Sequence, residues 1–194
     1  MKLTDLIKIG KETVSVLYPE REAGEMVFAY LEEFVGTKRH THIVEPDHEV
    51  ASEKADLALR AFDRMAKGEP LQYVIGKAWF YGRQFHVTPD VLIPRPETEL
   101  LCDTVLKQLS GKGVPAPKAH SSRILDLCTG SGAVGVSLAK MLPYAEVTMV
   151  DISMPALEIA RENAVIAGVA DAVVPTVGSV ADFKNPLSYG TVIC

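Results

Sequence analysis

The 194-residue sequence is long enough for one large domain or two small ones, and its 47% apolar content is typical of a globular protein with a core. The net charge is −5 and the sequence has no basic stripe, so we expect no direct binding to nucleic acid. No stretch approaches the ~20 apolar residues of a membrane span, and the charged N-terminus is unlike a signal peptide. These features predict a cytoplasmic protein without membrane contact.

The sequence contains three cysteines and no C-x-x-C motif. Cys102, Cys128 and Cys194 each lie in an apolar run, which favours buried free thiols in a reducing compartment. His40 and His42 have no third ligand nearby, so we predict no metal site.

The first 70 residues have the spacing of a small helical bundle. Helices are predicted over 3–17, with Thr4 as the N-cap, from Pro19 to a stop at Gly36, and over 47–67. Residues 37–45 have the composition of a loop. Short connections favour antiparallel neighbours.

Aromatic and β-branched residues are enriched from 72 to 93, which predicts a β-hairpin with a flanking loop. A helix is expected from Glu97 to about Leu109, after the rigid Pro94-Arg95-Pro96 segment. Residues 111–122 are rich in Gly, Pro and Ser and are predicted to form a linker.

From residue 123 the pattern alternates between strands and helices. Strands are expected at 123–128, 145–151 and 172–177, and helices at 132–142 and 154–167. Such alternation predicts a doubly wound parallel sheet. The last residues are typical of a strand that is just beginning, so we expect a chain truncated within this sheet.

A glycine turn follows the strand that begins at Ile124. Gly130 and Gly132 lack a Cβ, so a ligand can approach the backbone closely at the start of the next helix. Asp151 ends the neighbouring strand, where a carboxylate can accept hydrogen bonds from both hydroxyls of a ribose. The pattern predicts an adenosine-binding site, although a bare helix-capping turn is the simpler alternative.

The spacing of Gly130, Gly132 and Gly135 also matches the G-x-G-x-x-G fingerprint of NAD-binding domains. Asp126 lies immediately before the turn, where a fixed anion would oppose a pyrophosphate. A ligand with a cationic amine and a sulfonium would be favoured there. Both groups occur in S-adenosylmethionine, which we therefore predict as the cofactor.

Four segments resemble the HemK/PrmC family: Pro70-Leu-Gln-Tyr-Val-Ile-Gly76, Phe80 to Val91, Leu92-Ile-Pro-Arg-Pro-Glu-Thr-Glu99 and Asp126-Leu-Cys-Thr-Gly-Ser-Gly132. The resemblance runs through nearly all of the chain. It implies S-adenosylmethionine-dependent methylation of the glutamine in the Gly-Gly-Gln motif of class I peptide chain release factors.

The resemblance also implies roles for individual residues. It places Asp126 near the methionine end of the cofactor, Asp151 at the ribose, and Arg95 and Glu97 beside the substrate channel. The cofactor loop falls on Cys128, Thr129, Gly130, Ser131 and Gly132. The family has an acidic residue and an aromatic near the adenine. Here those positions read Ser179 and Val180, which puts the contact in doubt unless Asp182 substitutes.

The family's Asn-Pro-Pro-Tyr motif, which holds the substrate amide, is expected after the strand that starts at Gly190 and is missing from this sequence. Asn185-Pro186-Leu187 precedes that strand and is not the motif. The catalytic residues are therefore unassigned, and we expect this chain to be inactive in turnover.

In sum, the sequence predicts an α/β protein in three parts. A helical bundle that docks the substrate protein covers 1–70, a β-hairpin linker covers 71–95, and a truncated Rossmann-like methyltransferase domain covers 96–194. We expect a monomer. Two alternatives stay open: an amino-group methyltransferase acting on DNA or another protein, and a non-catalytic partner-binding module.

Overall fold

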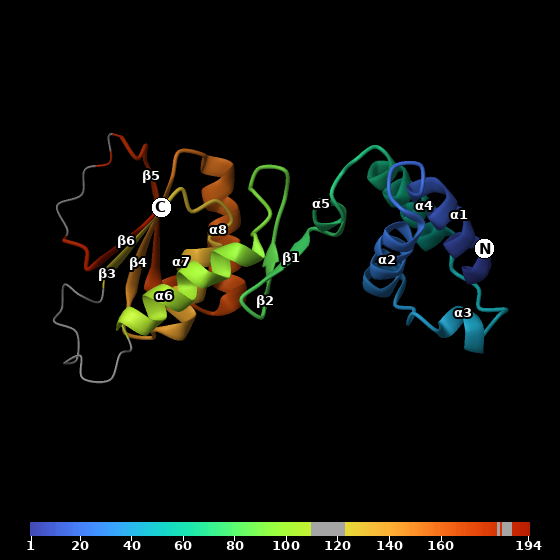
Figure 1. Cartoon of the computed structure of the whole chain (residues 1–194), viewed down its shortest axis with the longest axis horizontal. Helices are drawn as coiled ribbons and strands as arrows, with labels where there is room; N and C mark the ends of the chain where they lie inside the picture. Colours follow the sequence, from blue (N-terminus) through green and yellow to red (C-terminus); the bar gives the residue numbers. More distant parts are fainter. Residues whose placement is uncertain (110–122, 182, 184–187) are drawn as a thin grey trace. The chain divides into compact units, whose positions relative to one another are not determined.

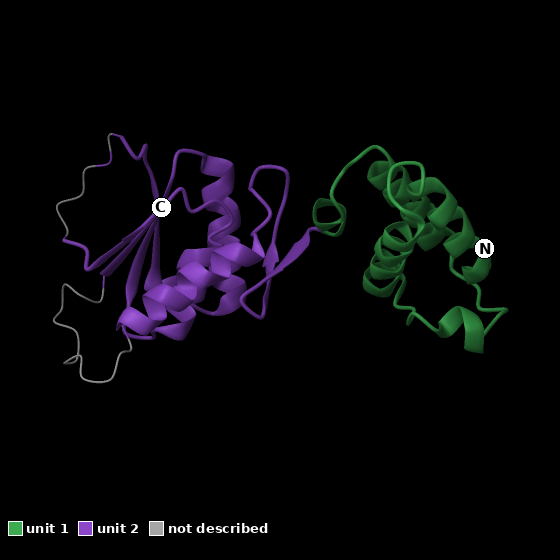
Figure 2. Ribbon diagram, viewed as in Figure 1, with its two compact units in different colours: residues 1–75 green, residues 76–194 purple. Residues whose placement is uncertain are grey.

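The computed structural model describes residues 1–109, 123–181, 183 and 188–194. These form two compact units, Met1–Ile75 and Gly76–Cys194, which are coloured separately in Figure 2. The predicted linker at 111–122, together with Asp182 and Asn185-Pro186-Leu187, lies outside the described residues.

Unit 1 is helical (Figure 1). Its elements are α1 (Leu3–Val14), α2 (Glu20–Tyr30) with a π-helical extension at Leu31–Val35, α3 (Thr41–Val44), α4 (Ser52–Ala66) and α5 (Leu71–Ile75). The α1 helix packs against both α2 and α4. The phenyl ring of Phe62 is fully buried and lies against Gly10, which allows α1 and α4 to approach closely. The predicted helical bundle is confirmed.

Three local predictions in unit 1 were wrong. Thr4 does not cap α1, because the helix already begins at Leu3 and the N-cap position is Lys2. A short helix, α3, interrupts the predicted loop. Residues 71–75, expected at the start of the hairpin, form the helix α5, whose Val74 is buried in the unit 1 core.

Unit 2 begins with an antiparallel hairpin of β1 (Lys77–Phe80) and β2 (Arg83–His86). Tyr81 and Gly82 connect the strands with φ values of 49° and 70°, as a two-residue type I′ turn requires. Phe80 and Phe85 are buried in the unit 2 core, so the hairpin packs onto the α/β layer. The predicted hairpin is confirmed, although its strands are shorter than expected.

The rest of unit 2 is built on a parallel sheet. Its strands are β3 (Arg123–Leu127), β4 (Glu146–Asp151), β5 (Val173–Val177) and β6 (Thr191–Ile193), in the order β5-β4-β3-β6. The helices are α6 (Glu99–Leu109), after a 3₁₀ turn at Pro96–Thr98, α7 (Ala133–Met141) and α8 (Met154–Ala167), with a second 3₁₀ turn at Ala170–Ala172. The predicted alternation of parallel strands and helices is confirmed.

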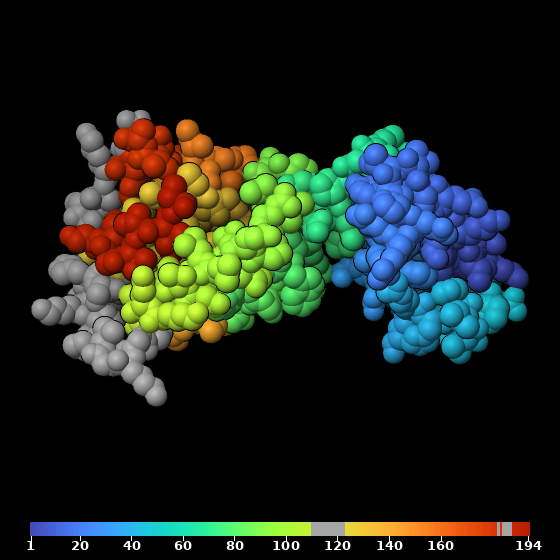
Figure 3. All heavy atoms as spheres, in the orientation of Figure 1, coloured from blue at the N-terminus to red at the C-terminus, as the bar shows by residue number. Residues whose placement is uncertain are grey.

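The order of the strands determines where a ligand can bind at the edge of the sheet. The chain moves from β3 to β4 and β5 on one side and returns to β6 on the other. In open parallel sheets, ligands bind outside the carboxyl ends of the strands at such a reversal. In Figure 3 the red C-terminal residues lie beside yellow atoms of the segment that follows β3. None of the described helices is long and apolar enough to cross a membrane.

Candidate nucleoside-binding site

The glycine turn connects β3 to α7 at the carboxyl edge of the sheet. The amide of Thr129 donates to the carbonyl oxygen of Val150 on β4, at 3.0 Å, so the turn is tied to the neighbouring strand. The amide of Gly132 donates to the carbonyl oxygen of Thr129 at 2.9 Å, which closes the turn before α7 begins at Ala133. The predicted strand–turn–helix segment is present.

Asp126, the fourth residue of β3, is 3% exposed. Its Oδ2 accepts a hydrogen bond from the Thr129 hydroxyl at 2.6 Å and one from the Gly135 amide at 3.0 Å. Burial raises the pKa of Asp126 to about 6, although these two hydrogen bonds act in the opposite direction. The side chain thus connects the strand, the turn and the first turn of α7. Its predicted contact with a cofactor stays a prediction.

Asp151 ends β4 and is partly exposed. Its Oδ2 accepts from the Gly130 amide at 2.9 Å and its Oδ1 accepts from the Ser153 amide at 3.0 Å. Each carboxylate oxygen has a second lone pair, so both can also accept from a ligand hydroxyl. Asp151 therefore orients the turn and retains the capacity to bind a ribose.

A side chain at each of the three fingerprint glycines would have different surroundings. A Cβ on Gly130, where φ is +53°, would meet no described atom within 4 Å, so the space above it is accessible to a ligand. On Gly132, where φ is +77°, it would lie 3.0 Å from the Cβ of Ala160 on α8. On Gly135 it would lie 2.9 Å from both the Oδ2 of Asp126 and the Cγ of Met149. The second and third glycines therefore serve packing, and only the first borders open space.

Two cysteine predictions were wrong. Cys102 on α6 is buried as expected, and burial raises the pKa of its thiol to about 12. Cys128 and Cys194 are exposed, because they follow β3 and β6 at the open carboxyl edge of the sheet. Cys128 also has a positive φ of 57°, which is rare outside glycine and indicates local strain in the turn.

Asn163, on α8, is a residue of the site that was not predicted from the sequence. Its side-chain amide nitrogen donates to the carbonyl oxygen of Ser131 in the glycine turn and to that of His86 on β2, both at 2.9 Å. Its Oδ1 accepts from the His86 amide at 2.6 Å. An asparagine within an amphipathic helix carries no sequence signal for such contacts, since they depend on distant segments.

Ser179 and Val180 follow β5. The hydroxyl of Ser179 accepts a hydrogen bond from the Ala181 amide at 3.3 Å, and Val180 is 50% exposed. A Cβ on Gly178 would lie 3.1 Å from the ring of Phe183, so an aromatic side chain lies at this strand end three positions beyond the expected one. Phe183 was not singled out in the sequence, because its spacing differs from the family pattern.

Arg95 and Glu97, the predicted substrate-channel residues, are exposed at the 3₁₀ turn before α6. The engaged acid in this segment is Glu99, whose Oε1 accepts from the Tyr81 amide at 2.8 Å. The Tyr81 hydroxyl donates to Asp103 at 2.6 Å, and this bond, together with burial, raises the pKa of Tyr81 to about 12. The segment is thereby attached to the tip of the hairpin, and the roles of Arg95 and Glu97 stay predictions.

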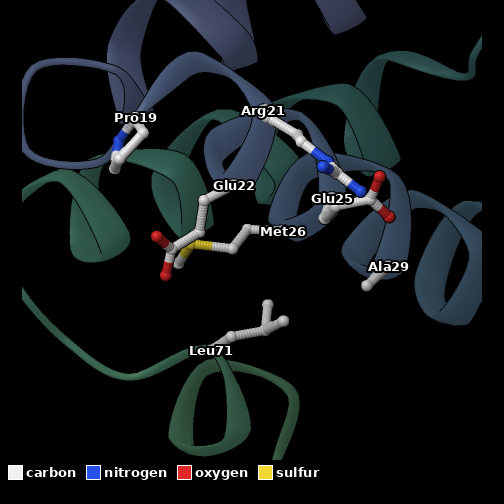
Figure 4. Close-up of a pocket in the computed structure, with 7 residues that line it drawn as sticks. All are labelled: Pro19, Arg21, Glu22, Glu25, Met26, Ala29 and Leu71. Carbon is white, nitrogen blue, oxygen red and sulfur yellow. The ribbon is translucent and has the colours of Figure 1, made fainter.

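Unit 1 has a pocket of its own, between the start of α2 and α5 (Figure 4). Its volume is about 560 Å³, with apolar surface from Met26, Ala29 and Leu71. The charged lining residues are Arg21, Glu22 and Glu25. No chemistry is assigned to this pocket, and the nucleoside-type site belongs to unit 2.

A glycine turn at the reversal of a parallel sheet, with carboxylates on adjacent strand ends, defines a nucleotide- or nucleoside-binding α/β domain. Two family models match the chain: the Methyltransferase small domain at residues 99–194 and the PrmC N-terminal domain at 14–76. Together they span most of the sequence. The chain belongs to the HemK/PrmC family.

Two relatives that are named release factor glutamine methyltransferases are similar to this chain over part of their length. The release factor glutamine methyltransferase of Bordetella pertussis is 49% identical over 124 residues, which are 64% of this chain and 41% of the relative. That of Neisseria gonorrhoeae is 43% identical over 146 residues, or 75% of this chain and 49% of the relative. The chain thus spans about half or less of the length of these relatives. Among solved structures, an RNA methyltransferase from Salinibacter ruber in complex with S-adenosyl-L-homocysteine is 24% identical, with a TM-score of 0.37, over 47% of this chain and 53% of that one.

Proposed function

We propose that this chain is the cofactor-binding part of an S-adenosylmethionine-dependent enzyme that methylates the glutamine of the Gly-Gly-Gln motif in class I release factors. The names of the relatives support the substrate, and the methyltransferase family model supports the cofactor. We place the reaction in the cytoplasm and the enzyme as a monomer.

The observation that carries the proposal is the use of amide groups in the glycine turn and in the first turn of α7. The Gly130 amide donates to Asp151 and the Gly135 amide donates to Asp126. A dinucleotide pyrophosphate needs such amides free, and it would also be repelled by the Asp126 carboxylate before the turn. A cationic sulfonium nucleoside needs neither amide and is attracted by the carboxylates. The site therefore favours S-adenosylmethionine over NAD.

In this proposal Asp151 accepts hydrogen bonds from the two ribose hydroxyls, and the open space above Gly130 admits the nucleoside. The other loop residues, Cys128, Thr129, Ser131 and Gly132, surround it through their backbone. Asp126 lies beneath and favours positive charge. Ser179, Val180 and the ring of Phe183 are our candidates for the adenine end.

S-adenosylmethionine supplies an activated methyl group. When bound, it would transfer this methyl group to the glutamine nitrogen, which would lose one proton, and S-adenosylhomocysteine would remain. An amide nitrogen is a weak nucleophile because its lone pair is delocalised into the carbonyl, so it has to be held in line in a site that excludes water. We propose that unit 1 docks the release factor, and that Arg95 and Glu97 border the channel through which the glutamine enters.

Calorimetric titration tests the cofactor. We expect S-adenosylmethionine to bind and NAD not to bind. Gly130→Ala places a methyl group where the nucleoside would lie, so affinity should fall at least tenfold. Gly36→Ala is the matched control: Gly36 also has a left-handed φ, of +83°, and open surroundings among the described atoms, but it lies in unit 1. NAD binding, or equal affinity in the two variants, would contradict the proposal.

A methyl-transfer assay on a release factor tests the reaction. The 194 residues contain no Asn-Pro-Pro-Tyr string, so we expect cofactor binding without turnover. Clear multiple turnover would show that other residues hold the amide. Methylation of a DNA adenine or another protein, in place of the release factor, would support the amino-group alternative.

A further inference from the structure

We propose that Asn163 is a positioning residue of the cofactor site, because its side chain fixes the glycine turn to the hairpin. This inference rests on the proposed function of the turn and extends it to a residue that touches no cofactor. Asn163 is 2% exposed and lies on α8, behind the turn.

Both hydrogens and the oxygen of the Asn163 side-chain amide are hydrogen-bonded. The nitrogen has two hydrogens, and it donates to the carbonyl oxygens of Ser131 and His86. The oxygen accepts from the amide of His86. Toward β2 the side chain thus acts as the partner strand would, exchanging both bonds with one residue. A buried amide with every donor paired rigidifies its surroundings.

The bond to Ser131 has a direct consequence for the turn. Ser131 is itself 3% exposed and stands between Gly130 and Gly132, so its carbonyl has little access to water. The turn is therefore held from two directions. From the strand ends, Asp151 accepts from the Gly130 amide and Asp126 accepts from the Thr129 hydroxyl. From α8, Asn163 donates to the Ser131 carbonyl.

The same side chain determines where the hairpin lies against the turn. Asn163 is 32 residues from Ser131 and 77 from His86 along the chain, and its side chain forms direct hydrogen bonds to both. The hairpin leads through Val87 into the segment that carries Arg95. A shift of the hairpin at His86 would therefore be transmitted to the turn, and cofactor affinity should depend on this link.

Two substitutions separate positioning from stability. Asn163→Leu keeps the number of side-chain heavy atoms and the branch at Cγ, and it removes all three hydrogen bonds. We therefore expect S-adenosylmethionine affinity to fall about tenfold, the equivalent of one lost hydrogen bond to the turn. Asn163→Asp keeps the acceptor. As a carboxylate it faces two carbonyl oxygens, whereas as a protonated acid it can donate to one of them.

The resulting pH profile is the diagnostic readout. Each variant is compared with wild type at the same pH, between pH 5 and pH 8. We expect Asn163→Asp to recover affinity relative to wild type as the pH falls, and Asn163→Leu to stay weakened throughout. A merely structural role would lower the melting temperature without this recovery.

Other titratable groups near Asn163 are common to all variants, and Asn163→Leu, which adds no charge, controls for their titration. Arg83 and Lys140 line a pocket with Asn163, and the imidazole of His86 pairs with Glu162 at 3.0 Å. Asp126, with a pKa of about 6, lies on the other side of the turn. Ile159→Val on the same helix controls for mild destabilisation and should bind cofactor as wild type does.

The outcomes are distinguishable. If wild type fails to bind S-adenosylmethionine, the proposed function fails. If wild type binds and folded Asn163→Leu binds equally well, the positioning role is overturned. The same holds if the loss in Asn163→Asp, relative to wild type, does not change with pH.

Discussion

Asp126→Asn tests whether the buried carboxylate beneath the turn lowers the free energy of unfolding by an amount that depends on pH. The pKa of Asp126 is raised from 3.8 to about 6, and burial is the largest cause. Below about pH 4 the group is neutral in both states. Between about pH 4 and pH 6 the unfolded chain loses the proton that the folded protein keeps, so the free energy of unfolding falls as the pH rises.

The magnitude follows from the shift of about two units. At about 1.4 kcal/mol per unit, the full effect is about 3 kcal/mol. Between pH 5 and pH 8 the free energy of unfolding changes by about 1.4 kcal/mol. The change is smaller than the full effect because the unfolded chain is already ionised at pH 5, where Asp126 in the folded protein is still about ten times more often protonated than ionised. The Thr129 and Gly135 contacts can be retained in Asp126→Asn, since an asparagine oxygen can accept from both the Thr129 hydroxyl and the Gly135 amide.

Urea denaturation at pH 5 and pH 8 measures the effect. The transition is followed by far-ultraviolet circular dichroism, because the single tryptophan, Trp79 in unit 2, is 68% exposed and its fluorescence would change little on unfolding. The stability of wild type relative to Asp126→Asn should decrease by about 1.4 kcal/mol from pH 5 to pH 8. Asp171→Asn, at an exposed position, is the control for loss of one negative charge. A wild-type-to-variant difference that is the same at both pH values would refute the reasoning.

Two further predictions concern packing and hydrogen bonding. In Gly10→Ala the new Cβ would lie 2.7 Å from Cε2 of the buried Phe62 ring, so unit 1 should lose about 1–3 kcal/mol in a helix-detected melt; an unchanged melting temperature would show that the ring can move. In Tyr81→Phe the 2.6 Å bond to Asp103 is lost, and unit 2 should lose about 1–2 kcal/mol near neutral pH. Because the pKa of Tyr81 is raised to about 12, this contribution should persist to about pH 10 and disappear by about pH 12 in wild type, while the variant lacks that transition. Wild type and Tyr81→Phe of equal stability at pH 8 would contradict this.

The sequence alone was sufficient wherever a structure depends on residues close together along the chain. Helical spacing and Gly36 located the first helices, and the order strand, glycine turn, helix located the candidate site. Asp151 could be placed because a strand ends there, and parallel strands end at one edge of a sheet. The family could be inferred from short strings, which the two family models bear out.

Some features were decided only by tertiary contacts. Residues 71–75 have strand-forming side chains, yet they form a helix whose Val74 completes the core of unit 1. Cys128 and Cys194 lie in apolar runs, yet they are exposed because both follow strands at an open edge.

Asn163 is the clearest case. Its residue type and position on a helix predict an ordinary polar side chain, whereas its function depends on two segments that lie 32 and 77 residues away. Local pattern determined which residues form the turn, because turn geometry is set by neighbouring residues. Only the fold decided what holds that turn, because the partners of its backbone groups come from β4 and α8 and meet only when the chain is packed.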